Sequence, residues 1–541
     1  MQTLDEKLHK SSEFLFGVEL VSIRGSMSEQ RAIKARTFAN ELVEFPSVDW
    51  ISITDNAGGN PQLAPQALAK PILYAGKEVV IHLSCKDLNR NGLESAAWQL
   101  NSEGFHNALA ITGDYPVSGN GGMAKPVFDL DSVGLISLLN KMNHGIDEHH
   151  KKTQFCIGAV VNNYKLKEGE LVPQYLKLGK KIECGASFII NQVGYDARKA
   201  HELRLYMDNH SMKHVPLIGN VFMLSPRVAK IFHEGKIPGI SVSRELLDIC
   251  SKQAQSPDEG KAFFQEFAAK QISIFRGLGY RGAYLGGMHH VDSIQRILEI
   301  EKSFSSDDWK GFVEEFEFSR PGEFFFYERD PSTRLAAFKE VPRQKMQGLN
   351  LSYRFSKWVH EVTFSPGNGL ARIGADIVRS SDDPSQGPAW VRIVEKVTKS
   401  ALFDCRDCGD CSLPEIAYLC PESQCAKNQR NGPCGGTREG KCEVDGYGDC
   451  IWLRAYERLK TDGKEETLLD HSPVLQDQGL RGTSSWANNW MGRDHAGKKT
   501  NTDLTPQDNS ENGPSPKALK SPLQERGSES RSKNSGFGGA M

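Results

Sequence analysis

The sequence lacks a surplus of charge of either sign: 66 Lys and Arg stand against 68 Asp and Glu in 541 residues. A balanced chain has neither the basic footprint of a nucleic-acid-binding protein nor a polybasic membrane anchor. It also lacks an apolar run long enough to span a bilayer. Its start, "MQTLDEKLHKSSEFLFGVEL", has acids and lysines before only a short apolar run, unlike a secretory signal. These absences predict a soluble, cytoplasmic protein that binds neither nucleic acid nor membrane.

The first 300 residues show a regular alternation of two kinds of segment. Short β-rich runs with nearly continuous apolar residues alternate with stretches of helical spacing, which is typical of parallel strands buried on both faces. Eight such repeats predict an α/β fold, a closed (β/α)₈ TIM barrel over 1–300, with an open doubly wound sheet as the alternative. The expected strands are 13–21, 48–55, 78–85, 107–114, 155–161, 185–192, 215–224 and 282–288.

The rest of the chain divides into three parts by composition. We interpret 301–400 as a connecting region that belongs partly to the C-terminal domain, with "EFFFYERD" and "WVHEVTF" as pieces of a second, smaller unit. Residues 401–497 form a smaller cysteine-rich, metal-binding domain, in which "AYERLK" ends a helix. Residues 498–541 are rich in Ser, Asn, Pro, Gly and charge, which predicts a disordered tail.

Cysteine is unevenly distributed. Four of the twelve (Cys85, Cys156, Cys184 and Cys250) are scattered, as expected for buried small apolar side chains. In a reducing compartment a cluster of cysteines more often holds metal than forms disulfides. Eight thiolates suffice for two four-thiolate sites, and they are Cys405, Cys408, Cys411, Cys420, Cys425, Cys434, Cys442 and Cys450.

The spacing of these cysteines favours one kind of metal. Two consecutive C-x₂-C steps, followed by Cys420-Pro421, resemble the pattern that holds iron–sulfur clusters. Zinc prefers two separated C-x₂-C pairs. We therefore favour [4Fe–4S] clusters, with zinc as the alternative and a disulfide scaffold as the third interpretation.

Polar residues follow the expected barrel strands, and active sites of such barrels lie at that end of the strands. Glu19 stands between apolar Val18 and Leu20, so burial would raise its pKa and suit it to general acid catalysis. The alternative is a satisfied polar contact inside the barrel. The other residues at strand ends are Thr54, Asp55, Asn56, His82, Ser84, Thr112, Gly113, Asp114, Asn191 and Gln192.

Five ordered motifs carry a family resemblance: "FGVEL", "ISITDNAGG", "VIHLSC", "ALAITGDYP" and "INQVGYD". Over about 13–290 they resemble the barrel of methylenetetrahydrofolate reductase, a flavin enzyme. The resemblance implies that Glu19 protonates the folate ring nitrogen and that Asp114 lies near the flavin pyrimidine edge. It also implies that Gln192 holds the pterin and that His290 contacts the folate tail. The implied cofactor contacts are Thr54, His82, Thr112, Gly113, Phe128, Lys180 and Lys181, with Thr112 and Lys180 standing where the family has arginine.

A second resemblance covers the cysteine-rich region. "NQRNGPCGGTREGKCEVDGYGDCIW" and "SSWANNWMGRDH" are similar to the C-terminal domain found with these reductases, which often carries iron–sulfur clusters. Together the resemblances imply a cytoplasmic flavoprotein of one-carbon metabolism that interconverts 5,10-methylenetetrahydrofolate and 5-methyltetrahydrofolate. They favour FAD over FMN, an electron donor that is NAD(P)H or ferredoxin, and a homo-oligomer or a complex with a redox partner. The alternatives are a flavin-free barrel methyltransferase and a zinc-clipped scaffold that docks a partner.

Overall fold

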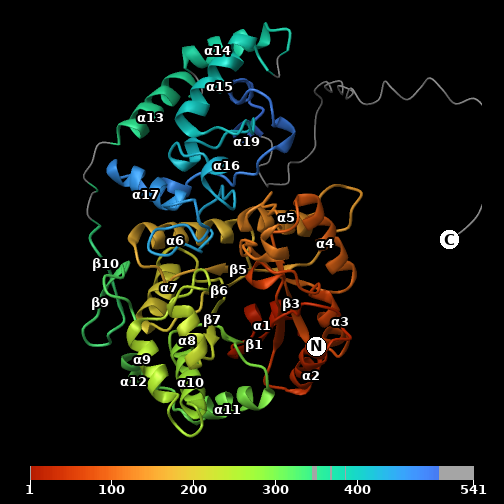
Figure 1. Ribbon diagram of the computed structural model, residues 1–541, viewed down its shortest axis with the longest axis vertical. Helices are drawn as coiled ribbons and strands as arrows, with labels where there is room; N and C mark the ends of the chain where they lie inside the picture. The colour runs from red at the N-terminus through yellow and green to blue at the C-terminus, as the bar shows by residue number, and fades with distance from the viewer. Residues whose placement is uncertain (1, 344–345, 347–349, 366–367, 384–385, 499–541) are drawn as a thin grey trace, which may run out of the picture. The chain divides into compact units, whose positions relative to one another are not determined.

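The computed structural model describes residues 2–343, 346, 350–365, 368–383 and 386–498, which belong to one unit, Met1–Lys498 (Figure 1). The tail predicted over 498–541 lies outside the described residues apart from Lys498. No helix in the described ranges has the length and apolar character needed to cross a membrane.

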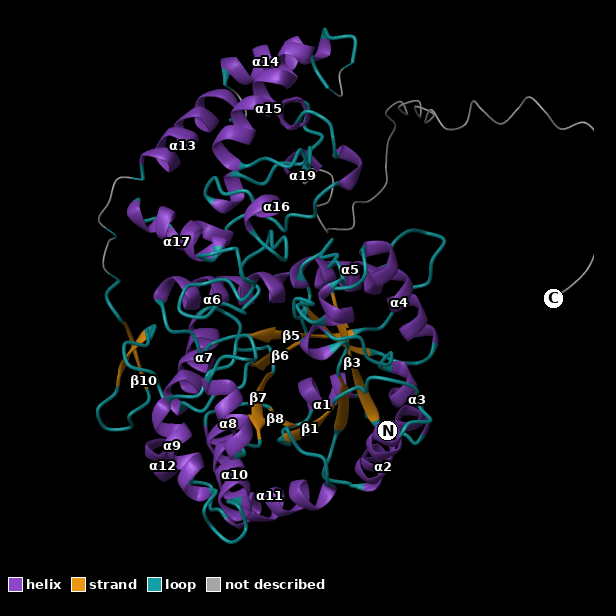
Figure 2. Ribbon diagram, viewed as in Figure 1, coloured by secondary structure: helices purple, strands orange, loops and turns teal. Residues whose placement is uncertain are grey.

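Eight parallel strands close into a barrel in sequence order, β1 to β8, with β8 paired to β1. The ring of strands lies inside a layer of helices (Figure 2). The predicted TIM barrel is confirmed, and the open doubly wound sheet is wrong. The strands are β1 Leu15–Leu20, β2 Trp50–Ile53, β3 Glu78–Ser84, β4 Asn107–Ile111, β5 Cys156–Val161, β6 Phe188–Asn191, β7 Leu217–Phe222 and β8 Gly282–Gly286.

Side chains alternate along each strand between the barrel interior and the helix layer, since successive residues of a strand point to opposite faces. Trp50, Leu109 and Tyr284 belong to the interior cluster. The surrounding helices are α2 Gln30–Glu44, α3 Gln66–Tyr74, α4 Arg90–Ser102, α5 Ser132–His144, α6 Glu168–Glu183, α7 Ala197–Asn209, α8 Pro226–His233, α9 Arg244–Gln253, α10 Lys261–Gly277 and α11 Val291–Ser303.

One end of the barrel is closed by the N-terminal helix α1 (Leu4–Lys10). Leu4 and Leu8 join the interior cluster, and the Leu4 amide donates to Glu78 Oε2, at the start of β3, at 3.1 Å. Arg281, just before β8, donates to the Leu8 carbonyl at 3.0 Å. The opposite end, where the strands finish, is left for a site.

The region after the barrel contains a two-stranded sheet that packs on the barrel and a series of helices that follow it. The segment "EFFFYERD" includes β9 (Tyr327–Arg329), which pairs with β10 (Ala336–Glu340) and packs on α7, where Glu202 accepts from the Phe326 amide at 2.6 Å. "WVHEVTF" lies mainly in α13. The remaining helices are α12 Trp309–Phe312, α13 Leu351–Thr363, α14 Gly369–Arg379, α15 Ala389–Phe403, α16 Pro421–Gln424, α17 Ile451–Thr461, α18 Ser485–Trp490 and α19 His495–Lys498.

Candidate active site and cysteine groups

Glu19 lies on β1 with its side chain toward the barrel interior, because its neighbours Val18 and Leu20 belong to the outer core. Gly286 on β8 leaves room for the carboxyl, since a Cβ there would lie 3.1 Å from Glu19 Oε2. Burial raises the pKa of Glu19 to about 7, and the nearby Tyr284 hydroxyl opposes this only in part. At neutral pH a substantial fraction of this carboxyl is therefore protonated and able to donate a proton.

A neutral imidazole stands two strands away from this acid. Ser52 on β2 is the register partner of Glu19, and its hydroxyl lies 2.9 Å from His82 Nε2 on β3. Burial lowers the pKa of His82 to about 4, so the ring is uncharged at neutral pH. Thr54 is also buried, and its hydroxyl accepts from the Ser22 amide at 3.0 Å.

The turn after β4 brings together three residues that the sequence assigned to the cofactor. Gly113 has a φ of +87°, a conformation that favours glycine. Asp114 Oδ2 accepts from the Gly58 amide at 2.8 Å, which ties the loops after β2 and β4 together. Phe128 is buried and stacks with Tyr115 at a ring-centre distance of 6.3 Å.

The two lysines assigned to cofactor phosphates are held by backbone carbonyls. Lys181 Nζ donates to the Val160 carbonyl at 2.5 Å, and burial lowers its pKa to about 7. Lys180 Nζ donates to the carbonyl of His471 in the cysteine-rich domain. Contact with phosphate therefore stays a prediction for both.

The two residues assigned to the folate follow two other strands, β6 and β8. Gln192 directly follows β6, and its side-chain oxygen accepts from the Val193 amide at 2.9 Å. His290 is exposed and directly precedes α11. Their roles in substrate binding also stay predictions.

The cysteine-rich domain reaches the β4 turn directly, which the sequence did not predict. Lys427 Nζ donates to the Gly113 carbonyl at 2.7 Å, and the Thr112 hydroxyl donates to Gln429 Oε1 at 3.4 Å. Such contacts join residues more than 300 positions apart, so no local spacing signals them. They place Lys427 and Gln429 against the proposed cofactor turn.

Lys427 is buried and carries its charge there. Burial alone would lower its pKa, but the Glu443 carboxylate that pairs with it, together with Cys434 and Asp114, raises it. The ammonium group lies 5.9 Å from the centre of the Phe128 ring. A positively charged side chain therefore lies next to both the β4 turn and Cys434.

The eight clustered cysteines separate into two groups of four in chain order. We call them the first cysteine group and the second cysteine group, and the members of each line a small cavity of their own. All twelve cysteines of the described chain are free thiols, so the disulfide scaffold is wrong. The first group is Cys405, Cys408, Cys411 and Cys420, and the second is Cys425, Cys434, Cys442 and Cys450.

Backbone N–H groups and cations point at these sulfur atoms. Backbone amides donate to Cys405 Sγ and Cys425 Sγ, each at 3.4 Å. Lys399 Nζ lies 3.2 Å from Cys411 Sγ. Within the described ranges no three His, Cys, Asp or Glu side chains converge closely enough to hold a single metal ion.

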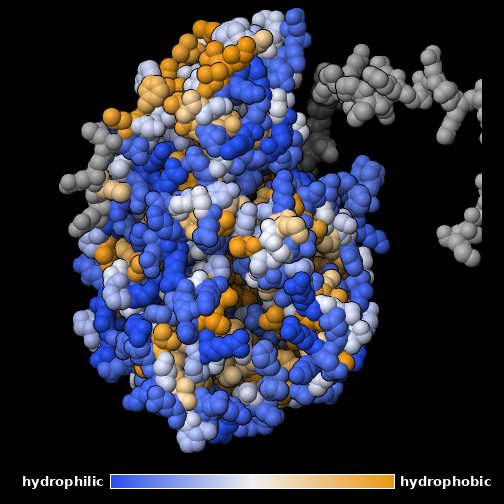
Figure 3. Space-filling model, viewed as in Figure 1, coloured by the Kyte–Doolittle hydropathy of each residue, from blue (hydrophilic) through white to orange (hydrophobic). Residues whose placement is uncertain are grey.

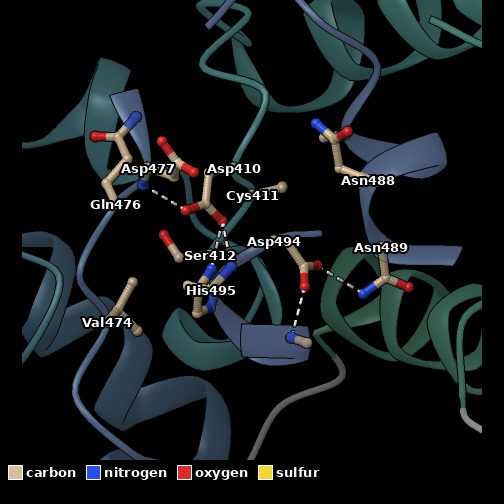
Figure 4. Close-up of polar contacts among 12 residues, drawn as sticks. Asp410, Cys411, Ser412, Val474, Gln476, Asp477, Asn488, Asn489, Asp494 and His495 are labelled. Atoms are coloured by element: carbon tan, nitrogen blue, oxygen red, sulfur yellow. Dashed lines mark hydrogen bonds and ion pairs between the residues drawn. The ribbon is translucent and has the colours of Figure 1, made fainter. Parts of the chain in front are cut away.

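A buried ion cluster holds the loop of the first cysteine group (Figure 4). Asp410, between Cys408 and Cys411, accepts from His495 Nδ1 at 2.5 Å and from the Asp477 amide at 2.7 Å. Burial alone would lower the pKa of His495, but Asp410 and Glu415 raise it to about 10. A charged imidazole from α19 therefore fixes this loop.

These features define a class: a closed parallel barrel with a carboxyl of raised pKa at its mouth, in contact at one turn with a domain that has two four-thiol groups. The family model described as methylenetetrahydrofolate reductase matches residues 6–301, and that described as methylene-tetrahydrofolate reductase C terminal matches residues 389–478. Because the first match covers more than half of the chain, the chain belongs to the methylenetetrahydrofolate reductase family.

Individual relatives are distant. Methylenetetrahydrofolate reductase 2 of Schizosaccharomyces pombe is 26% identical over 279 residues, 49% of this chain, which spans only 37% of that relative's length. A Clostridium thermocellum structure described as binding two copies of 5-methyl-5,6,7,8-tetrahydrofolic acid is 13% identical, with a TM-score of 0.41 and coverage of 56% and 98%. A structure of 2,3-dimethylmalate lyase is 13% identical, with a TM-score of 0.32, and the match covers 57% of this chain and 89% of that one. Neither structural similarity carries a functional argument.

Proposed function

We propose that the chain is a flavin-dependent oxidoreductase that interconverts 5,10-methylenetetrahydrofolate and 5-methyltetrahydrofolate. The observation that carries the proposal is Glu19, a buried carboxyl in the barrel mouth whose pKa is raised to about 7. Opening the ring of the methylene substrate needs a proton on a ring nitrogen. An acid with a pKa near the working pH is the most efficient donor.

The residues around the mouth carry the types of chemical group that a flavin site needs. They offer a neutral imidazole at His82, a glycine turn that lets backbone approach a ligand at Gly113, and the Asp114 carboxylate. The Tyr284 side chain is buried beside Glu19 and Ser52 and adds a hydroxyl group to the mouth. When bound, the flavin supplies hydride transfer at N5. FAD is the form we propose.

The division of labour among the chain's own groups follows from their charges. Glu19 holds the proton that opens the ring and takes it back in the reverse direction. His82 stays neutral and accepts or donates a hydrogen bond without adding positive charge. Asp114 adds negative charge at the turn, which Lys427 balances from the other side.

For the cysteine groups we propose two iron–sulfur clusters, one in each group. The four thiols of each group line one small cavity. The two consecutive C-x₂-C steps of the first group resemble the spacing that holds an iron–sulfur cluster, whereas zinc prefers two separated pairs. Backbone donors and nearby cations would stabilise the negative charge of a cluster and tune its potential.

The test is anaerobic purification followed by absorbance spectroscopy and addition of 5-methyltetrahydrofolate. The proposal expects about one flavin per chain and bleaching of its absorbance as the folate is oxidised. Protein that binds no added flavin but still transfers a methyl group would favour the flavin-free methyltransferase. Protein that contains zinc and neither binds flavin nor turns over would favour the scaffold.

A further inference from the structure

Helix α15 buries charged side chains and exposes apolar ones, the reverse of an ordinary amphipathic surface helix. Its buried positions include Glu395 and Lys399, which are 3% and 6% exposed. Its outer face carries Trp390, Ile393 and Val397, which are 59%, 62% and 65% exposed. Their i, i+3, i+7 spacing makes a continuous apolar stripe toward solvent, where a surface helix normally has polar residues.

The buried charges fix this orientation. Glu395 accepts from the Ser484 hydroxyl at 2.5 Å and from the Ser485 amide at 3.0 Å. Lys399 lies against Cys411 Sγ at 3.2 Å, within the first cysteine group. Turning the helix over would break these contacts and leave the Ser484 hydroxyl and the Ser485 amide without their acceptor. The outward apolar stripe is therefore a stable feature of the fold.

The neighbouring helices extend the apolar surface. Phe355 and Trp358 on α13 are 57% and 59% exposed, and Ile373 on α14 is 55% exposed. Figure 3 shows hydrophobic side chains gathered over α13, α14 and α15, which we call the apolar face. Ten large apolar side chains of these helices are 47% to 69% exposed. At ~150–250 Å² for a large side chain, half exposed, they present on the order of 1,000 Å².

That area is larger than a monomer ordinarily exposes. The largest apolar patch on a typical monomer measures about 300–600 Å². One side of a standard protein–protein interface measures about 800 Å². The apolar face is therefore large enough for a specific partner.

A cavity joins the apolar face to the first cysteine group. It has a volume of about 240 Å³, and its lining includes Phe355, Leu402 and Trp486 together with Cys411. An apolar side chain or cofactor edge entering this cavity would come close to a sulfur atom of that group. The cavity therefore connects the apolar face with a thiol of the first cysteine group.

The charge on these helices selects the partner. Of the seven Lys and Arg on α13, α14 and α15, Lys399 is buried and three are in ion pairs, namely Lys357, Arg379 and Arg392. Arg354, Arg372 and Lys396 are exposed and form no ion pair within the described ranges. A second copy of the chain would bring the same positive charge to the interface, whereas an acidic protein is complementary.

We propose that the apolar face is the docking surface for an acidic one-electron carrier protein, which exchanges electrons with the first cysteine group. The inference rests on the proposed function, since it needs a redox cluster there. Each docked carrier loses one electron. Two such encounters, with two protons from water, balance the two-electron reduction of one flavin.

The test compares binding of a small acidic ferredoxin to the anaerobically purified holoenzyme and two variants by titration calorimetry. Ile393→Glu combined with Val397→Glu places two carboxylates in the stripe, and we expect the Kd to rise about tenfold or more, ~1.4 kcal/mol per tenfold. Phe338→Glu is the matched control, an 82% exposed apolar residue on β10. We expect it to bind ferredoxin like the unaltered protein.

A second variant separates charge from packing. Lys396→Glu should weaken ferredoxin binding more at low salt than at high salt, because exposed charge pairs are screened by ions. Failure of ferredoxin to bind the unaltered protein, or equal affinity for the stripe variant, would overturn the inference. So would a dimer that the stripe substitutions dissociate. Flavin bleaching by 5-methyltetrahydrofolate does not involve this surface, so it fails only if the proposed function fails.

Discussion

Glu19 shows how much of the proposed chemistry depends on one position in the barrel. Its carboxyl is exposed enough to meet a substrate, yet buried enough for its pKa to rise to about 7. The sequence predicted this shift from its apolar neighbours Val18 and Leu20. Those neighbours in fact face the helix layer. Burial in the barrel interior raises the pKa, and the Tyr284 hydroxyl opposes this in part.

The stability of the protein should report this shift. The pKa of Glu19 is raised in the folded state from 4.5 to about 7, so the folded state binds more protons than the unfolded state between these values. The free energy of unfolding therefore falls as pH rises through this window, by up to about 3 kcal/mol. Glu19→Gln removes this loss. We expect the urea midpoint of the variant minus that of the unaltered protein to increase from pH 4.5 to 7 and to remain constant above pH 7.

Because His82 titrates in both proteins, its own contribution cancels in this comparison. A constant difference between the two midpoints across this range would contradict the raised pKa of Glu19.

At the scale of the element, the turn after β4 concentrates the contacts between the two parts of the chain. A Cβ at Gly113 would lie 3.0 Å from the Lys86 Cβ and 3.1 Å from the Ser84 Cβ, which cannot swing away. Its φ of +87° adds strain for any other residue. The turn is thus shaped by both crowding and backbone conformation.

Substitution of this glycine should affect flavin binding. For Gly113→Ala we expect flavin affinity to fall about tenfold or more, ~1.4 kcal/mol per tenfold, when apoprotein is titrated and flavin fluorescence is followed. Gly121→Ala is the matched control: its φ is +67°, but a Cβ there meets nothing within 4 Å. Equal flavin affinity for the two variants would contradict the role of this turn.

The elements differ in how far the sequence predicts them. The eight strands were predicted because buried parallel strands leave nearly continuous apolar runs, such as "VVIHLS" in β3. The exposed apolar stripe of α15 was not predicted, because spacing alone does not say which face of a helix is buried. Glu395 and Lys399 reverse the usual assignment through partners about 90 and 12 residues away.

At the scale of the whole molecule, the two cysteine groups differ in what they adjoin. The first is next to the apolar face, through Cys411. The second cavity is lined by Lys427, which also contacts the β4 turn. The arithmetic of eight thiols predicted two groups, but only the fold shows which cysteines go together and which group borders the barrel.

Metal analysis of cysteine variants should separate the two groups. Two [4Fe–4S] clusters give about eight iron atoms and about eight sulfides per chain. We expect Cys411→Ala and Cys442→Ala each to retain about half of the iron, since each removes a ligand from a different group. Cys250→Ala, in the buried core of the barrel, should retain all of it. Zinc without iron, or loss of all iron in either variant, would contradict two independent clusters.

The most direct test of the central claim is the rate at which the reduced flavin is reoxidised by 5,10-methylenetetrahydrofolate, followed by stopped-flow absorbance across pH. In the unaltered protein the rate should fall as pH rises above about 7, where Glu19 loses its proton. Glu19→Gln should be slower by about 10²–10⁴-fold, without this pH dependence. A Glu19→Gln protein that reoxidises its flavin at the unaltered rate would contradict the account.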